Sequence, residues 1–222
     1  MPTARCRRSS VFCAPPPGAV LGVLLMGLFV AHAATAQPRT WRVDPGHSRL
    51  VVHVARAGVL SAALHDHQFV AQRWSGTVSF DPEHPERSTT QLSVAAGSLH
   101  DVEPGISAND VRSIENDARG AEVLDVARYP EVTLASQRLE ITPGTLSAGA
   151  LHGTLVASLT LHGQTRPMRI PVEATWTGNE LRVRGSVGFR QSGFGITPYH
   201  RALGAIAVRD MVNVEFDVRA TP

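Results

Sequence analysis

Apolar and polar residues alternate along several stretches of the chain, and this period of two limits what the chain can fold into. From Leu151 to Leu161 the odd positions are apolar or small, whereas most even positions are polar. The same alternation occurs in residues 168–176, 181–190 and 212–219. Because successive side chains of a strand point to opposite faces, each stretch is predicted to form a half-buried strand.

Less regular strands are predicted at 41–54, 69–80, 91–100 and 131–141, with Gly- and Pro-rich turns between them. Residues 107–127 differ, because they lack proline and mix apolar with charged residues, with Ser107 or Asn109 as a possible cap. This segment is predicted to form one or two short helices. The chain is therefore expected to be mainly β with about eight strands. Alternation alone leaves a closed barrel and a two-sheet sandwich as alternatives.

The first residues have the layout of a secretory signal peptide. Arg5, Arg7 and Arg8 precede an apolar run at 18–30, and Ala34-Thr35-Ala36 offers a cleavage site. The run is short for a membrane span, which needs about 20 apolar residues. We therefore expect a signal peptide at 1–36, a mature domain at 37–222, and a periplasmic or secreted protein; the alternative is a retained signal anchor.

Removal of residues 1–36 would change two properties of the chain. Cys6 and Cys13 both lie in this segment, so the mature domain has no thiol for a disulfide, a zinc site or a nucleophile. Three of the 21 basic residues, but none of the 19 acids, also lie there, which leaves about one net negative charge. Such a balance gives no indication of nucleic-acid binding.

Six landmarks resemble, in their order, the sequence pattern of the YceI-like family. They cover essentially the whole mature chain. They are Trp41-Arg42-Val43-Asp44-Pro45-Gly46-His47-Ser48, Gly76-Thr77-Val78-Ser79-Phe80-Asp81-Pro82, Val123-Leu124-Asp125-Val126-Ala127-Arg128-Tyr129-Pro130-Glu131-Val132, Leu151-His152-Gly153-Thr154-Leu155, Leu159-Thr160-Leu161-His162-Gly163-Gln164-Thr165-Arg166-Pro167 and Phe194-Gly195-Ile196.

The resemblance implies an exported, eight-stranded antiparallel lipocalin-like barrel that binds a polyisoprenoid or an isoprenoid quinone. It also implies a possible partner, because some family members occur with cytochrome b561-type membrane proteins. The sequence departs from the common pattern at residues 60–69, where His65 and His67 form a His-x-His pair in place of a Gly-rich stretch. We interpret this as a variant branch of the family.

Large apolar residues on the predicted inner face are the candidates for a channel around the ligand tail. The alternative is an ordinary filled core, since an eight-stranded barrel can close on its own side chains. The candidates are Trp74, Val78, Phe80, Trp176, Val187, Phe189, Phe194 and Phe216.

Five polar residues are candidates for contacts with a ligand head group at the mouth: His47, His65, His67, Arg190 and Asp210. His65 and His67 would share a face of an extended strand, and two imidazoles on one face can begin a divalent-metal site. The alternatives are structural hydrogen bonds for the histidines and exposure to solvent for Arg190. For Asp210 the alternative is a bulge near Met211 that returns the carboxylate to solvent.

The sequence thus predicts a binding protein for an apolar ligand, without a cofactor. No motif typical of hydrolases, metalloproteases, phosphate loops or haem attachment is present, so an enzyme is not expected. Two alternatives remain: a redox-associated or hydrolytic metal protein using His65 and His67, and a structural barrel with a protein partner. The oligomeric state is left open.

Overall fold

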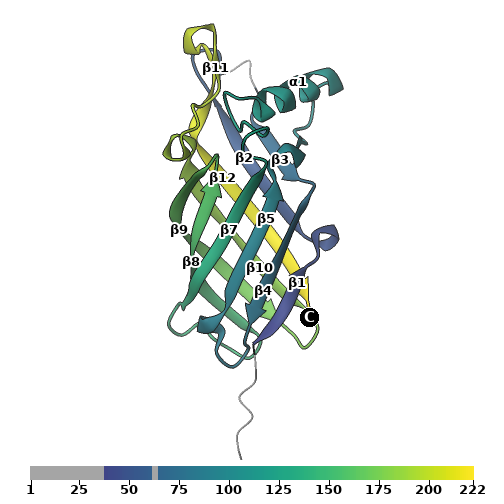
Figure 1. Cartoon of the computed structure of the whole chain (residues 1–222), viewed down its shortest axis with the longest axis vertical. Coiled ribbons are helices and arrows are strands. Elements are labelled where there is room, and N and C mark those ends of the chain that lie inside the picture. Colours follow the sequence, from purple (N-terminus) through teal and green to yellow (C-terminus); the bar gives the residue numbers. More distant parts are fainter. Residues whose placement is uncertain (1–37, 62–64) are drawn as a thin grey trace, which may run out of the picture. The chain divides into compact units, whose positions relative to one another are not determined.

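The structure, a computed structural model, describes residues 38–61 and 65–222, which belong to one compact unit (Figure 1). The predicted signal peptide at 1–36 lies outside the described residues. Among the described residues, antiparallel strands dominate. They are β1 (Arg39–Val43), β2 (Arg49–Ala57), β3 (His67–Ala71), β4 (Trp74–Phe80), β5 (Thr89–Ala95), β6 (Leu99–Asp101), β7 (Glu131–Ile141), β8 (Ala150–Leu161), β9 (Gln164–Trp176), β10 (Leu181–Arg190), β11 (His200–Arg201) and β12 (Ile206–Thr221).

Pairing closes these strands into an eight-stranded barrel. β1 and β2 act as one long strand, since both pair with β12 on either side of a 3-10 turn at Pro45–His47. In the same way β4 pairs with β1 while β3 pairs with β2, and β5 pairs with β4 while β6 pairs with β3. β1 also pairs with both β4 and β12, which closes the ring. The prediction of a barrel is confirmed, and the sandwich is excluded.

The two ends of the barrel differ. Turns 81–88, 142–149 and 177–180 lie at one end, which we call the closed end. Helix α1 (Ala108–Arg119), residues 58–61 and residues 191–205 lie at the other, which we call the α1 end (Figure 1). Helix α1 falls within the segment 107–127 that was predicted to contain one or two short helices. No helix among the described residues is both long and apolar enough to cross a membrane.

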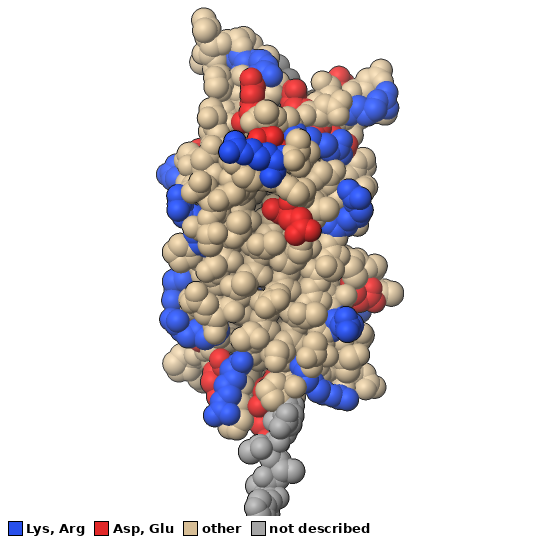
Figure 2. All heavy atoms as spheres, viewed as in Figure 1, with Lys and Arg blue, Asp and Glu red and all other residues tan. Residues whose placement is uncertain are grey.

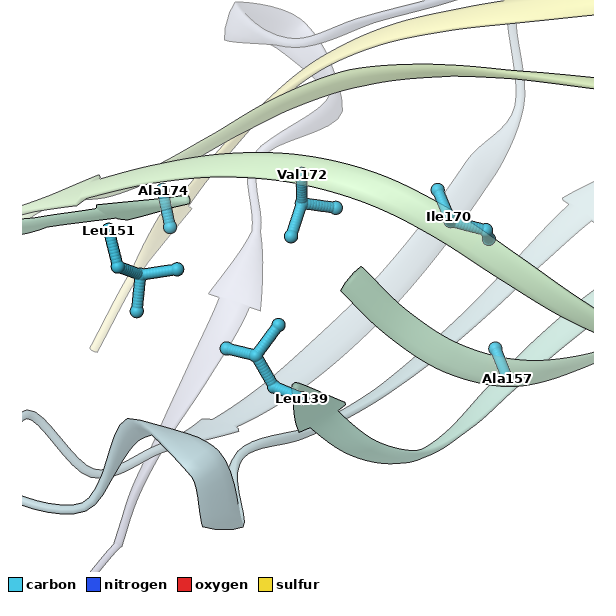
Figure 3. Packing of buried hydrophobic residues seen from close by; sticks show 6 residues of the cluster. All are labelled: Leu139, Leu151, Ala157, Ile170, Val172 and Ala174. Carbon is cyan, nitrogen blue, oxygen red and sulfur yellow. The ribbon is translucent and has the colours of Figure 1, made fainter. Parts of the chain in front are cut away.

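Alternate side chains of the strands point into the barrel, as the period of two predicts. Leu139 of β7, Leu151 of β8 and Val172 of β9 are buried and point toward one another (Figure 3). Gly185 of β10 lies opposite Phe216 of β12, and a Cβ there would lie 2.6 Å from the ring. The missing side chain therefore makes room for the phenyl ring across the barrel wall.

Aromatic rings fill the closed end. The ring centroids of Trp41 and Phe80 are 6.3 Å apart, and those of Phe80 and Trp176 are 5.1 Å apart, both in edge-on arrangements. Leu181 and Ala220 complete this cluster, and both are 1% exposed. Edge-on aromatic pairs pack densely, so this cluster seals one end of the barrel interior.

Helix α1 is held over the other end by one buried carboxylate. Glu115 accepts hydrogen bonds from His100 Nδ1 (2.6 Å), the Asp101 backbone N–H (3.2 Å) and Arg119 (2.8 Å). Arg119 also donates to the backbone oxygen of Gly97. Burial alone would raise the pKa of Glu115, but the three donors outweigh it and hold the pKa below its ordinary value.

We expect Glu115→Gln to lower the free energy of unfolding at neutral pH by about 1.5–3 kcal/mol, the usual range for hydrogen bonds to a charged group. Because the folded pKa is lowered, this stabilisation is fully present above the ordinary pKa of 4.5 and is lost as the pH falls below it. The difference between wild type and variant should therefore shrink in acid. Urea unfolding at several pH values measures it.

Glu173→Gln is the matched control, because that side chain is 63% exposed on β9 and pairs with the exposed His152. It should change stability by less than about 1 kcal/mol. Equal effects of the two substitutions at neutral pH would contradict the role given to Glu115.

Candidate ligand-binding cavity

A cavity of about 350 Å³ occupies the barrel between the aromatic cluster and helix α1. Its wall is almost entirely aliphatic and aromatic, with contributions from β2, β5, β7, β8, β9, β10 and β12. A volume of this size lies within the range of small-molecule sites, about 300–1,000 Å³. The wall includes Leu50, Val52, Val54, Leu92, Val132, Leu134, Leu155, Leu159, Ile170, Val183, Val212 and Val214.

The cavity extends to the α1 end of the barrel. Ile114 and Ala118 of α1, together with Val123 and Leu124 after the helix, line its outer part. The aromatic cluster of Trp41, Phe80 and Trp176 blocks the opposite end. An apolar molecule would therefore enter beneath α1 and extend toward the closed end.

Four of the eight predicted channel residues line the cavity: Val78, Val187, Phe189 and Phe216. The other four lie outside its wall. Phe80 and Trp176 belong to the aromatic cluster. Trp74 is buried with Val43, Val94 and Val218, and Phe194 packs edge-on against Phe189 with centroids 5.2 Å apart. Contact of any of these residues with a ligand stays a prediction.

Sequence reasoning missed much of the wall because it selected large aromatic residues. Leu50, Val52 and Val54 of β2 line the cavity, and all three occupy even positions of one strand. The same alternation that identified the other strands could have found them. The residues Ile114 and Ala118 carry no such signal, because only the tertiary fold brings α1 over the barrel end.

His67 is the polar side chain of the predicted pair that reaches the cavity. It lies at the start of β3, and its Nδ1 is 2.7 Å from Oδ2 of Asp101. The Asp101 side chain is fully buried, and its other oxygen accepts the backbone N–H of Glu103. With Nδ1 occupied, Nε2 is the ring nitrogen left for a group in the cavity.

His65 does not lie in a matching position. It precedes β3 and is exposed, whereas His67 is partly buried against the cavity. The strand starts at His67, so the two-residue spacing does not place both rings on one sheet face. Among the described residues, no three His, Cys, Asp or Glu side chains gather as a metal site would require. Metal binding by His65 and His67 stays a prediction.

Two further polar contacts join the elements around the entrance. Tyr199 and Asp117 both line the cavity, and burial together with a hydrogen bond to Asp117 raises the pKa of the Tyr199 hydroxyl. Arg201 lies 4.5 Å from the centroid of the Tyr199 ring, and its Nη1 is 3.3 Å from Oε2 of Glu122. These contacts tie residues 199–201 to α1 and the segment after it.

His47 lies away from the cavity. It ends the 3-10 turn between β1 and β2, is exposed, and its Nδ1 lies 2.7 Å from Asp44 Oδ2. The hydrogen bond from His47 lowers the pKa of Asp44. This arrangement matches the structural alternative, in which His47 fixes the entry of a strand.

Asp210 and Arg190 also lie outside the cavity wall. The register between β12 and β2 shifts between Val208 and Val212, as a bulge requires. Asp210 then accepts hydrogen bonds from the backbone N–H (2.8 Å) and hydroxyl (2.7 Å) of Ser192, which lower its pKa. Arg190 is exposed and lies 3.4 Å from the same carboxylate. Asp210 thus fastens the turn after β10.

Comparisons with known proteins point to the same fold. The crystal structure of Burkholderia cenocepacia BcnA is similar with a TM-score of 0.64 and 19% identity, over 81% of this chain and 99% of that chain. A polyisoprenoid binding domain from Saccharophagus degradans has a TM-score of 0.58 and 16% identity, over 82% of this chain and 97% of that one. The Campylobacter jejuni YceI protein reaches 0.52 and 14%, over 68% and 82%.

Identities this low establish a shared fold alone. No curated protein sequence matches the chain significantly. The family model described as the YceI-like domain, however, matches residues 41–220, which include all the barrel strands except the first and last residues. The chain therefore belongs to the YceI-like family.

Proposed function

We propose that this protein is a carrier that binds an apolar ligand of the polyisoprenoid type inside its barrel and catalyses no reaction. The observation that carries the proposal is the cavity of about 350 Å³, whose wall is almost wholly apolar. A hydrocarbon tail needs no hydrogen bonds and gains about 0.8 kcal/mol for each buried CH₂. The similar Saccharophagus degradans domain, described as polyisoprenoid binding, supports this ligand class.

The position of polar groups supports an orientation for the ligand. His67 lies on the cavity wall near the α1 end, and Tyr199 and Asp117 line the entrance. The aromatic residues Trp41, Phe80 and Trp176 of the closed end do not line the cavity. We therefore place the tail toward the closed end and the polar head near His67.

The hydrogen bond between His67 and Asp101 indicates which ligand head groups His67 can bind. When the ring is neutral, its Nδ1–H donates to the Asp101 carboxylate and Nε2 accepts a hydrogen bond from a hydroxyl group. When the ring is protonated, Nε2–H donates to a carbonyl oxygen. An isoprenoid alcohol, phenol or quinone fits one of these two states.

The proposal also includes export of this protein from the cytoplasm. The features of residues 1–36 support a periplasmic or secreted location, where an apolar lipid needs a carrier to cross water. A cytochrome b561-type membrane partner stays a prediction that follows from the family resemblance alone.

Replacing Val187 by Trp should fill part of the cavity and weaken binding of geranylgeraniol about tenfold, the effect of losing burial of roughly two CH₂ groups. Ser186→Trp is the matched control, because Ser186 is the exposed neighbour on the same strand and faces outward. Titration followed by native mass spectrometry measures both. Equal affinities of the two variants would contradict binding inside the barrel.

Replacing His67 by Leu should weaken binding of geranylgeraniol about two- to tenfold, the usual net contribution of one hydrogen bond. Affinity for the matching hydrocarbon without the hydroxyl should not fall. His53→Leu serves as the control, because His53 pairs with Glu215 on the outer face of β2. If His67→Leu weakens both ligands equally, His67 shapes the cavity and does not hold the head.

A further inference from the structure

The charged groups on the cavity wall limit which ligand head groups the cavity can hold. Within the described part of the chain, the titratable side chains that line the cavity are His67, Asp117 and Tyr199, and no arginine is among the lining residues. The sequence contains no lysine. An anion that leaves water is costly unless a positive group pairs with it. The question is therefore whether any group at this site supplies a positive charge.

His67 does not supply a net positive charge, because a buried carboxylate lies against it. Its Nδ1 is 2.7 Å from Oδ2 of Asp101, whose side chain is fully buried. When the ring is neutral, the pair carries one negative charge and Nε2 accepts hydrogen bonds. When the ring is protonated, the two charges cancel. The pair of His67 and Asp101 is therefore neutral or negative toward the cavity in either state.

Asp117 adds a second carboxylate at the α1 end of the cavity. It lies in the last turn of α1, is half-buried and accepts a hydrogen bond from the Tyr199 hydroxyl. Burial, this hydrogen bond and the negative charge of Asp117 raise the pKa of Tyr199, so the hydroxyl keeps its proton. Because that proton is directed to Asp117, the Tyr199 oxygen is left as an acceptor. Both side chains therefore present acceptor atoms to a ligand.

The arginines next to this site are each matched by another acid. Arg119 donates to Glu115 (2.8 Å) and to the backbone oxygen of Gly97 (3.0 Å). Arg201 lies over the ring of Tyr199, but its Nη1 is 3.3 Å from Oε2 of Glu122. On the face shown in Figure 2, acidic and basic side chains are mixed at the α1 end. The surroundings of Asp117 thus give no excess of positive charge to offset its carboxylate.

We propose that Asp117 makes the cavity selective for apolar ligands with an uncharged head group and excludes those with a phosphate or carboxylate head on the same tail. This inference rests on the proposed function, since it concerns the head of a ligand whose tail lies in the barrel. A hydroxyl head is the best match, because it donates a hydrogen bond to the acceptors at this end. An ionised head offers acceptors only, and the charge of Asp117 repels it across a partly buried site.

The test compares geranylgeraniol with geranylgeranyl phosphate, which share one tail and differ in the charge of the head. Each is titrated at neutral pH into the purified protein, and binding is followed by native mass spectrometry. Wild type should bind the phosphate at least about tenfold more weakly than the alcohol. Asp117→Asn removes the charge and keeps an oxygen for Tyr199, so phosphate binding should become about tenfold stronger while alcohol binding changes less than about threefold.

Asp110→Asn is the matched control, because it makes the same substitution and removes the same charge on the same helix. Asp110 is exposed in the first turn of α1 and lies outside the cavity wall, so both affinities should stay as in wild type. Asp117→Ser should act like Asp117→Asn, which keeps the test independent of the folding of one variant. Tyr199→Phe removes the hydroxyl but retains the charge of Asp117, so the preference for the alcohol should persist.

The outcomes separate this inference from the proposed function. Equal affinity of wild type for the two ligands would overturn the selectivity and leave the carrier function intact. An unchanged preference in the Asp117 variants, an equal change in Asp110→Asn, or loss of the preference in Tyr199→Phe would also overturn the role of Asp117. Binding of neither ligand by wild type would overturn the proposed function itself, and the selectivity with it.

Discussion

Closure of the sheet is the constraint on which the rest of the structure depends. The first long strand, made of β1 and β2, pairs along β12, while β1 also pairs with β4. Each of these pairings satisfies backbone hydrogen-bonding groups that would otherwise form an open edge. Once the ring is closed, every inward side chain faces the same enclosed space. The cavity and its apolar wall follow from that geometry.

The barrel interior has a filled part and a hollow part, because inward residues of different size lie at different levels along the barrel. Trp41, Phe80 and Trp176 pack edge to face and fill the closed end, whereas valines and leucines leave space farther up the barrel. Between these levels, Gly185 has no side chain and so leaves room for the ring of Phe216. Filling one end stabilises the barrel by burial, which lets the other end remain hollow without the loss of a packed core.

The α1 end combines the features that concern function. Glu115 holds α1 against β6, Tyr199 and Asp117 join the helix to the loop before β12, and His67 presents one ring nitrogen to the cavity. The exposed apolar residues Val59, Leu60 and Leu203 also lie at this end. Polar contacts connect the elements at this end, while apolar residues form the wall of the cavity inside.

Much of the fold could be predicted from sequence, because alternation with a period of two is a local property of an extended chain. It predicted the strands at 151–161, 168–176, 181–190 and 212–219 and the inward faces of 151–161 and 181–190. The less regular stretches at 41–54, 69–80 and 91–100 were predicted as single strands, but the structure divides each of them into two. The order of the landmarks indicated the family. The tertiary structure alone decided that Phe80 and Trp176 fill the closed end while Val187 lines the cavity, since both sets share the inward face. It also separated His65 from His67 and gave Asp210 a structural partner in Ser192, because strand ends, bulges and nonlocal hydrogen bonds depend on residues far away in the chain.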